Sequence, residues 1–259
     1  MIADELWVER GGSTDPDGAP LLVLLHGMGH TAQVWRGLVE LLDGRRWLAV
    51  DLPGHGRSPW TGRYSFDAVA AAVAAAMDPV LPAGRTVLAV GHSMGGVIAL
   101  ALAALRPEVR GVLGFGIKVA WTAEELAAMG ARAAKPPKVF GTPDEARAAF
   151  IRFAGLDGVV SPDSALARSG IAETGSGYRL AADPRTMAVG APDMPPLLAA
   201  ARANATVVLA RGEHDHMVSD EALRAVDAGA VVVPGVGHNF HVTHPLALRK
   251  LADTVGGVG

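Results

Sequence analysis

The stretch TVLAVGHSMGGVIALALAAL, residues 86–105, decides the fold that this sequence predicts. Its first five residues form a short, largely apolar and β-branched run, which is typical of a strand buried on both faces of a sheet. The Ala- and Leu-rich run from Met94 onward predicts a helix. Between them, residues 91–95 match the pattern G-x-S-x-G in a strand–turn–helix context. The flanking glycines permit a close backbone approach, so we expect a strained turn that presents Ser93 at the helix N-terminus. The alternative is an ordinary serine N-cap.

The same alternation extends along most of the chain. Short apolar runs that end at turn residues predict strands at residues 21–25, 47–50, 86–90, 109–115, 205–210 and 230–233, with an early strand at 6–9 ahead of a Gly/Pro/Asp turn. Helical patterns lie between them, at 32–42, 66–77, 94–105, 219–226 and 246–255. Strands that alternate with helices predict an α/β fold, with a mostly parallel central sheet flanked by helices.

The alternation stops between residues 119 and 196. This segment shows helical stretches at 122–134, 143–154 and 161–169, and prolines punctuate it. Thr122 with Glu125 forms a capping-box pattern, and Thr142-Pro143 with Glu145 is a second helix-start signal. We therefore predict an α/β core made of residues 1–118 and 197–259, with residues 119–196 inserted as a helical cap.

The composition excludes several classes of protein. Of 259 residues, half are hydrophobic and 19% are charged, so the chain can bury a large core. The net charge of −3 and the absence of a long basic run argue against a nucleic-acid partner. No apolar run reaches the roughly 18 residues of a membrane span, and residues 1–10 lack a signal-peptide layout, so we expect a cytoplasmic protein. The chain has no cysteine, which leaves Ser93 as the one nucleophile that a motif supports.

With the motif around Ser93 in its expected context, the chain resembles the α/β-hydrolase superfamily, and within it the serine esterases and lipases that carry a helical cap. Members order their triad along the chain as nucleophile, acid and histidine. The segment RGEHDHMV, residues 211–218, resembles the Gly-x-x-Asp-x-x-Val acid loop, which implies Asp215 as the acid. Glu213 and Asp220 are weaker alternatives.

The resemblance also implies the base and the oxyanion hole. Gly237-His238, on a Gly-rich loop after the last predicted strand, resembles the position of the catalytic histidine. His241 and His244 are competitors, but His241 should point away from the site if Phe240 already begins a helix. The segment HGMG, residues 26–29, resembles the family's His-Gly-x segment, which implies backbone N–H donors at Met28 and Met94 and a structural role for His26. Residues 51–58 resemble another family landmark, a mainly structural turn.

For the substrate pocket the sequence offers fewer signals. Trp121 directly follows the fourth of the main predicted strands and, with Met28 and Met94, is the best candidate for a pocket wall. Lys118 is the cation placed to meet an anionic substrate, although such a lysine is more often solvated, and His92 is a further pocket candidate beside Ser93. Methionine adapts to varied apolar groups, so we expect a small or medium, mainly apolar small-molecule substrate.

Other chemistries have weaker support. His214-Asp215-His216 looks like a fragment of a metal-ligand run, but the upstream histidines lack the matching spacing, so we predict no metal. Gly91–Gly96 does not match G-x-G-x-x-G, which disfavours a dinucleotide, and we predict no cofactor. The leading hypothesis is a serine hydrolase acting on a carboxylic ester, lactone or thioester. A slow or non-catalytic sensor on the same fold, and a C–C bond hydrolase, amidase or perhydrolase, stay open, as does the oligomeric state.

Overall fold

Seven strands form one central sheet in the computed structural model, which describes residues 5–12 and 18–256. The spatial order is β1 (Val8–Gly11), β3 (Trp47–Val50), β2 (Leu21–Leu25), β4 (Val87–His92), β5 (Val109–Phe115), β8 (Thr206–Gly212) and β9 (Val231–Val233). Only β1 runs antiparallel, in register with β3, and the other neighbours in this sheet pair in parallel. The predicted mostly parallel sheet is confirmed, and the early strand lies two residues later than expected. Part of the predicted Gly/Pro/Asp turn, residues 13–17, lies outside the described residues.

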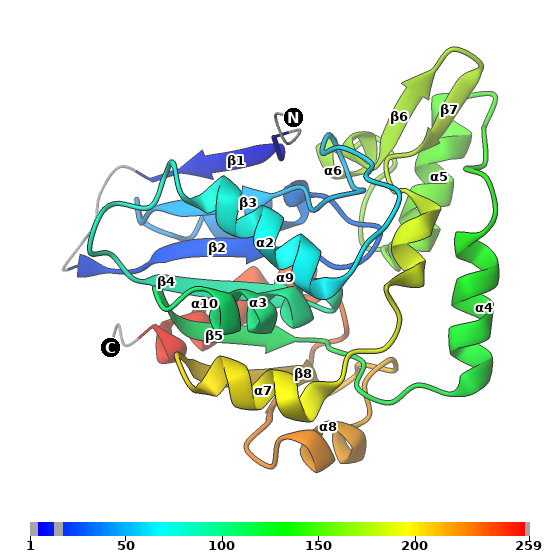
Figure 1. Cartoon of the computed structure of the whole chain (residues 1–259). Helices are drawn as coiled ribbons and strands as arrows, with labels where there is room; N and C mark the ends of the chain where they lie inside the picture. The colour runs from blue at the N-terminus through cyan, green and yellow to red at the C-terminus, as the bar shows by residue number, and fades with distance from the viewer. Residues whose placement is uncertain (1–4, 13–17, 257–259) are drawn as a thin grey trace.

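Each face of the sheet packs against its own set of helices. One face carries α2 (Phe66–Met77), α3 (Met94–Leu105), α7 (Met194–Arg202) and α8 (Asp220–Val226). The other carries the short turn η2 (Ala32–Trp35), α1 (Arg36–Val39), α9 (Phe240–Thr243) and α10 (Pro245–Val255). Figure 1 shows the sheet between these two layers.

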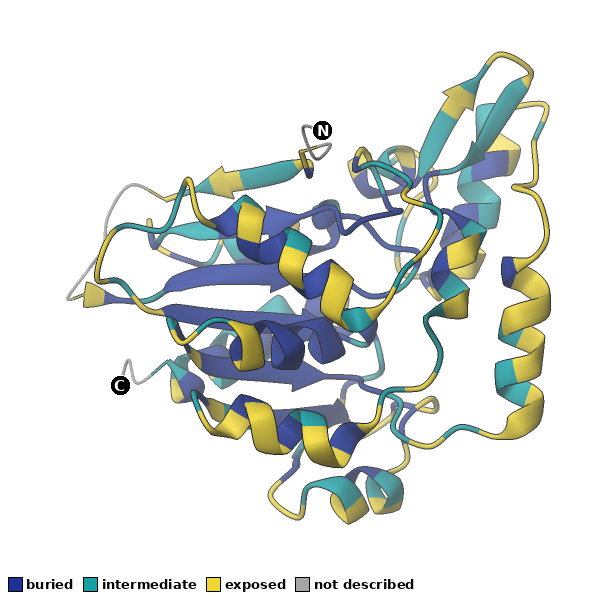
Figure 2. Cartoon of the chain, viewed as in Figure 1, coloured by how far each residue is buried: buried dark blue, intermediate teal, exposed yellow. Residues whose placement is uncertain are grey.

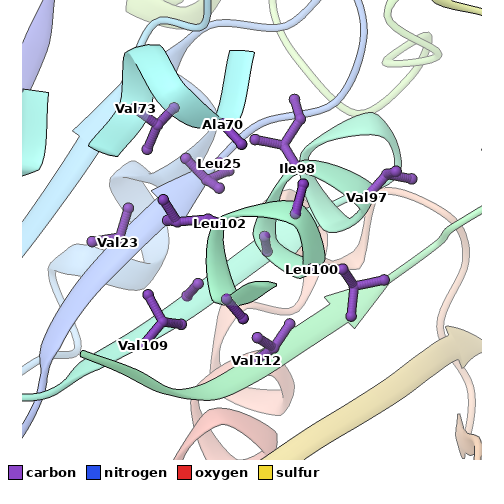
Figure 3. Packing of buried hydrophobic residues seen from close by; sticks show 14 of the residues in the cluster. Val23, Leu25, Ala70, Val73, Val97, Ile98, Leu100, Leu102, Val109 and Val112 are labelled. Carbon is purple, nitrogen blue, oxygen red and sulfur yellow. The ribbon is translucent and has the colours of Figure 1, made fainter. Parts of the chain in front are cut away.

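The alternation of side chains along each strand produces two cores. In β2, Val23 and Leu25 face the α2–α3 layer, whereas Leu22 and Leu24 face the α1–α10 layer. All five β2 residues are buried, as expected for a parallel strand that is covered on both faces. Figure 3 shows Val23 and Leu25 packed among side chains of α2, α3 and β5 on the first face.

Helix α3 lies directly against the sheet because its first turn is made of glycine. A Cβ atom on Gly95 would come within 2.1 Å of the Leu25 carbonyl oxygen, and one on Gly91 within 2.2 Å of the Gly95 oxygen. Both contacts are with backbone, which cannot yield as a flexible side chain can. The glycines of the G-x-S-x-G motif therefore set the distance between β4, α3 and β2.

The inserted segment begins with helices, as predicted, but it also contains a hairpin that the sequence prediction lacked. Helices α4 (Ala123–Ala133), α5 (Pro143–Phe153) and α6 (Ala165–Ser169) are followed by β6 (Ile171–Thr174) and β7 (Gly177–Leu180), which pair antiparallel, and by the turn η3 (Pro184–Val189). The four-residue strands are too short, and too polar, for a periodic signal. The predicted capping box at Thr122 is present, and the predicted helix start at Thr142 also forms a capping box with Glu145.

The insertion lies beside the carboxyl ends of the parallel strands, at the right of Figure 1. Its helix α4 is mainly exposed or intermediate, as the yellow and teal ribbon of Figure 2 shows. The predicted boundary at residue 196 falls inside α7, which begins at Met194 and packs against the core helix α3. The division of the chain into core and cap stays a prediction.

Hydrogen bonds join the insertion to the loop after β3. The buried Asp183 accepts a hydrogen bond from the Tyr64 hydroxyl at 2.8 Å, and its N–H donates to the Gly54 carbonyl at 2.8 Å. Arg185 forms an ion pair with the same carboxylate at 2.9 Å. Burial opposes ionisation of Asp183, but these partners hold the pKa of its carboxyl below the ordinary value.

Within residues 5–12 and 18–256, no helix is both long and apolar enough to cross a bilayer.

Candidate active site

Ser93 occupies the turn between β4 and α3 with a strained backbone. Its φ of 52° and ψ of −117° are unusual for a residue with a side chain, and among described non-glycine residues only Asp43 also has a positive φ. The Ser93 N–H donates to the Phe115 carbonyl at 2.8 Å, which fixes the turn to β5. The carboxyl end of β4 and the first turn of α3 thus hold Ser93 at the edge of two cavities. The predicted strand–turn–helix geometry is confirmed.

His238 and Asp215 come from separate loops and meet near this turn. His238 Nδ1 lies 2.9 Å from Asp215 Oδ2. The other carboxylate oxygen, Oδ1, accepts hydrogen bonds from the N–H groups of Met217 and Val218, at 2.9 and 3.2 Å. Burial alone would raise the pKa of the Asp215 carboxyl, but the hydrogen bond and charge of His238 and the two backbone donors hold it below the ordinary value. Asp215 is therefore an ionised, fixed partner for the imidazole.

The competing acids and the competing base lie elsewhere. Glu213 is exposed and accepts a hydrogen bond from the Gly235 N–H at 2.8 Å, and Asp220 pairs with Arg224 at 3.0 Å on the first turn of α8. His241 is fully buried in α9, which begins at Phe240 as the sequence analysis considered. Its ring packs near Trp35, with centroids 5.2 Å apart. None of the three has the paired geometry of Asp215 and His238.

The segment after β2 passes close to Ser93. A Cβ atom on Gly27 would lie 3.3 Å from the Ser93 Cβ and 2.7 Å from His92 Nδ1, so glycine is what allows this approach. Met28 follows directly and lines both cavities with Ser93. Met94, the first residue of α3, lines the more apolar of the two cavities. The two residues predicted as oxyanion donors are therefore both neighbours of Ser93.

His26 and Asp51 hold this part of the backbone in place. His26 Nδ1 lies 2.8 Å from the Gly27 carbonyl oxygen, and Leu52 N–H donates to His26 Nε2 at 3.0 Å. The Asp51 carboxylate accepts hydrogen bonds from the N–H groups of Ala32 and Arg57, at 2.7 and 2.9 Å. Burial lowers the pKa of His26 and raises that of Asp51. These contacts agree with the structural roles expected for both residues.

An apolar cavity of about 380 Å³ opens on one side of Ser93. Its wall combines core residues with side chains of the insertion, including the expected Met28, Met94 and Trp121. Met129 of α4 also lines this cavity. Several wall residues that are distant along the chain were not predicted from the sequence: Phe66, Val97, Ile117, Val189, Pro192 and two further methionines, Met187 and Met217. No local pattern marks these residues, because each looks like an ordinary core or helix position.

Lys118 and His92, the charged and the polar candidate for the pocket, each line a cavity but are held by neighbouring protein groups. Lys118 lines the apolar cavity, but its ammonium group pairs with Glu125 and lies 4.8 Å from the Trp121 ring centroid. It is therefore neutralised by the protein rather than free to meet an anion. His92 lines the second cavity, of about 470 Å³, together with His238, but only 1% of the residue is exposed.

The fold brings together three histidines that are far apart in the sequence. The buried residues His30, His92 and His241 have ring nitrogens within 4.8 Å of one another. The sequence pointed to His214 and His216, with His26 and His30 as the nearest upstream pair, and His214 and His216 are both exposed beside Asp215. The three buried histidines lie on a loop, a strand and a helix that are far apart in the chain, so no spacing rule could have grouped them.

The chain matches a family model, described as the alpha/beta hydrolase family, over residues 22–251. The chain belongs to the alpha/beta hydrolase family. The sheet order, the cap-like insertion and the strand–turn–helix at Ser93 fit this family.

Relatives of this alpha/beta hydrolase include enzymes with named activities. Lipase LipV of Mycobacterium tuberculosis is 40% identical over 108 residues, which is 42% of this chain and 39% of LipV. A pimeloyl-[acyl-carrier protein] methyl ester esterase of Aeromonas hydrophila is 44% identical over 104 residues, which is 39% of this chain and 37% of that esterase. The matches thus span about two-fifths of the length of these curated relatives.

A solved structure resembles nearly the whole chain. It is the Mycobacterium tuberculosis esterase Rv0045c, from work on its inhibition by transition metals. The two share 25% sequence identity and a TM-score of 0.72, over 97% of this chain and 92% of that one.

Proposed function

We propose that this protein is a serine hydrolase that cleaves carboxylic esters of small to medium, mainly apolar molecules through an acyl-enzyme. The observation that carries the proposal is the strained Ser93 turn, which borders the same cavity as a histidine already paired with a buried carboxylate. The named relatives include a lipase and methyl ester esterases, which supports ester hydrolysis as the reaction.

In the first half of the reaction, the Ser93 hydroxyl attacks the ester carbonyl carbon. Because His238 Nδ1–H donates to Asp215, the lone pair of the neutral ring is on Nε2, and this atom takes the Ser93 proton as the C–O bond forms. The imidazolium that results is stabilised by the Asp215 carboxylate, which stays ionised. His238 then returns the proton to the alkoxide oxygen, and the alcohol leaves.

Backbone N–H groups of Met28 and Met94 receive the carbonyl oxygen as it becomes an oxyanion. Helix α3 begins at Met94, so its N-terminal dipole adds to the donor there. Two fixed donors of this kind are each worth about 3–4 kcal/mol of transition-state stabilisation. Water that loses a proton to His238 then attacks the acyl-enzyme by the same steps in reverse, which releases the acid and restores Ser93.

The apolar cavity supports an acyl or alkyl group as the bound portion. Five methionines and three aromatic side chains contribute to its lining, and methionine adapts to different chain shapes. The insertion, residues 119–196 of the predicted domain division, acts in this proposal as the lid that completes the cavity, since Trp121 and Met129 belong to it. Lactones and thioesters present the same carbonyl and would react by the same steps.

The direct test compares turnover of p-nitrophenyl butanoate by the wild type and by Ser93→Ala. Loss of the nucleophile should lower kcat by at least about 10³-fold, because only the oxyanion hole and substrate binding then contribute. A fluorophosphonate probe should add one label per chain to the wild type and none to Ser93→Ala, as intact mass spectrometry would detect.

A matched control is Ser176→Ala, which removes an exposed serine from the β6–β7 turn and should keep both turnover and labelling. If Ser93→Ala hydrolysed the ester as fast as the wild type, the proposed nucleophile would be wrong. Binding of esters by the wild type without any turnover would instead favour a sensor on this fold.

A further inference from the structure

Three buried imidazole rings contact one another beside the cavity of about 470 Å³ that Ser93 borders. His30 follows β2, His92 ends β4, and His241 lies in α9. The ring centroids of His92 and His241 are 4.3 Å apart, and those of His30 lie 5.5 Å from His92 and 5.7 Å from His241. Exposed fractions of 2%, 1% and 0% show that the group is removed from bulk solvent.

Most of the ring nitrogens in this group have no hydrogen-bond partner. His30 Nδ1 and both nitrogens of His92 and of His241 are buried without one. A buried polar atom without a partner is unfavourable, and here five such atoms gather in one place. Three distant segments of the chain bring these nitrogens together. Apolar side chains would fill the same space without leaving polar atoms unpaired, so packing of the core does not by itself require histidine here.

A hydrogen bond to the Ala154 carbonyl orients the His30 ring for metal binding. His30 Nε2 lies 2.9 Å from the Ala154 carbonyl oxygen, so this nitrogen carries the proton and donates it. The lone pair of His30 therefore sits on Nδ1, the atom without a partner. A backbone carbonyl that receives the second N–H of an imidazole is the usual outer-shell support of a metal-bound histidine.

We propose that His30, His92 and His241 form a binding site for a divalent transition-metal ion of the Zn²⁺ class. The three candidate ligand atoms lie within 4.8 Å of one another, and a tetrahedral zinc site requires about 3.4 Å between nitrogens that are each about 2.1 Å from the ion. Small rotations of the rings close this difference. An all-imidazole set favours Zn²⁺, Ni²⁺ or Cu²⁺ over Mg²⁺ and Ca²⁺, and water supplies the fourth ligand.

An ion at this site would act on the proposed triad, so this part of the inference rests on the proposed function. His92 precedes Ser93, and its ring centroid is 4.6 Å from that of His238. His30 and His92 also line the cavity of about 470 Å³ that Ser93 and His238 border, which gives an ion its route of entry. Rotation of His92 toward the ion removes the packing that positions His238. We therefore expect Zn²⁺ to inhibit ester hydrolysis reversibly.

The first experiment measures binding and does not depend on activity. Purified protein is stripped with EDTA, dialysed, and titrated with CoCl₂ or ZnCl₂ alone. We expect one ion per chain, a visible absorption band typical of tetrahedral Co²⁺, and three imidazole ligands in X-ray absorption of the wild type. His30→Asn and His241→Asn should each weaken binding by at least about 10-fold, the scale at which even outer-shell groups act.

Two controls separate this site from other histidines. His244→Asn removes an exposed histidine near α9 and should bind like the wild type. His214→Asn with His216→Asn removes the exposed pair at the rim of the same cavity, and binding should again persist. Circular dichroism and thermal unfolding establish that each variant is folded, and the wild-type X-ray absorption remains informative if a buried variant is not.

The binding and turnover experiments give separate results for the proposed metal site and for the proposed ester hydrolysis. Loss of binding in His214→Asn/His216→Asn, or full binding in both His30→Asn and His241→Asn, would overturn the site. If Co²⁺ binds as expected while no ester is hydrolysed, the site stands and the proposed function fails. Zn²⁺ that binds at the three histidines without lowering p-nitrophenyl butanoate turnover would overturn the inhibitory role. Recovery of turnover with EDTA is the expected result.

Discussion

At the residue scale, a few side chains have environments that a sequence pattern cannot specify. Ser93 is held at a φ of 52°, and such strain persists only where the surrounding structure enforces it. Here the Phe115 carbonyl, which accepts the Ser93 N–H, and the flanking glycines enforce it. Asp215 has both carboxylate oxygens occupied, one by His238 and one by two backbone N–H groups. In the proposed reaction, this geometry would position Ser93 as the nucleophile and His238 as the base before the substrate binds.

Replacing Asp215 tests the proposed orientation of His238. Asp215→Asn removes the charge and the acceptor for the Nδ1 proton, so the wrong tautomer of His238 is favoured and kcat should fall by about 10⁴-fold. Glu213→Gln, the matched control at the competing acid, should keep kcat within about threefold. Equal losses in the two variants, measured with p-nitrophenyl butanoate at pH 8, would contradict the assignment of Asp215.

At the element scale, the contact between α3 and the sheet depends on glycines, which have no Cβ atom to hold the two backbones apart. The α3 helix is buried along nearly its whole length, and its first turn lies against the backbone of β2. Glycine lowers the intrinsic stability of a helix, but here it allows close approach of the main chains. Helix α4 provides the opposite case, since a Cβ atom on Gly130 would meet no atom within 4 Å.

The two glycines give a paired prediction for alanine substitution. Gly95→Ala should lower the free energy of unfolding by about 1–3 kcal/mol or more, because the new methyl group meets the Leu25 carbonyl oxygen. Gly130→Ala should raise it by up to about 1 kcal/mol, because alanine favours the helix and nothing obstructs it. Urea unfolding followed by circular dichroism measures both, and a stable Gly95→Ala would refute the close-packing argument.

At the scale of the whole molecule, burial of ionisable rings links stability to pH. His55 is fully buried between the loop after β3 and the insertion, where its backbone bridges to Ala182. Burial lowers the pKa of His55 to about 4 and that of His26 well below its ordinary value. The unfolded chain therefore binds protons near pH 6.5 that the folded chain does not. Stability is fully present above pH 6.5 and decreases as pH falls toward 4.

His55→Asn should reduce the rate at which the free energy of unfolding decreases as the pH falls. Without one buried imidazole, the unfolding free energy should change by about 1.4 kcal/mol less per pH unit between pH 6 and 4.5. Urea unfolding in EDTA-containing buffers across this range gives the two slopes. The exposed His244→Asn is the control and should follow the wild-type slope. A wild-type stability that stayed constant from pH 6.5 to 4.5 would contradict the argument.

Much of the candidate site could be anticipated because its residues occupy constrained backbone positions. Ser93 lies on a turn that only glycine neighbours permit, and Asp215 and His238 each follow a strand at the same edge of the sheet. The hairpin formed by β6 and β7 could not be anticipated, since its strands stabilise each other and pack on α5 rather than follow a periodic pattern. The cavity wall escaped prediction for a similar reason, because Phe66, Met187 and Met217 meet only after folding.

By itself, the sequence determined the alternation of strands and helices, and with it the parallel sheet and the turn at Ser93. These features follow from local periodicity and from the backbone freedom of glycine, which act between neighbours in the chain. Only the tertiary structure decided that His30, His92 and His241 share one buried site, that Lys118 is neutralised by Glu125, and that five methionines line one cavity. Those outcomes depend on distances between segments far apart in the chain, which packing sets and local pattern does not encode.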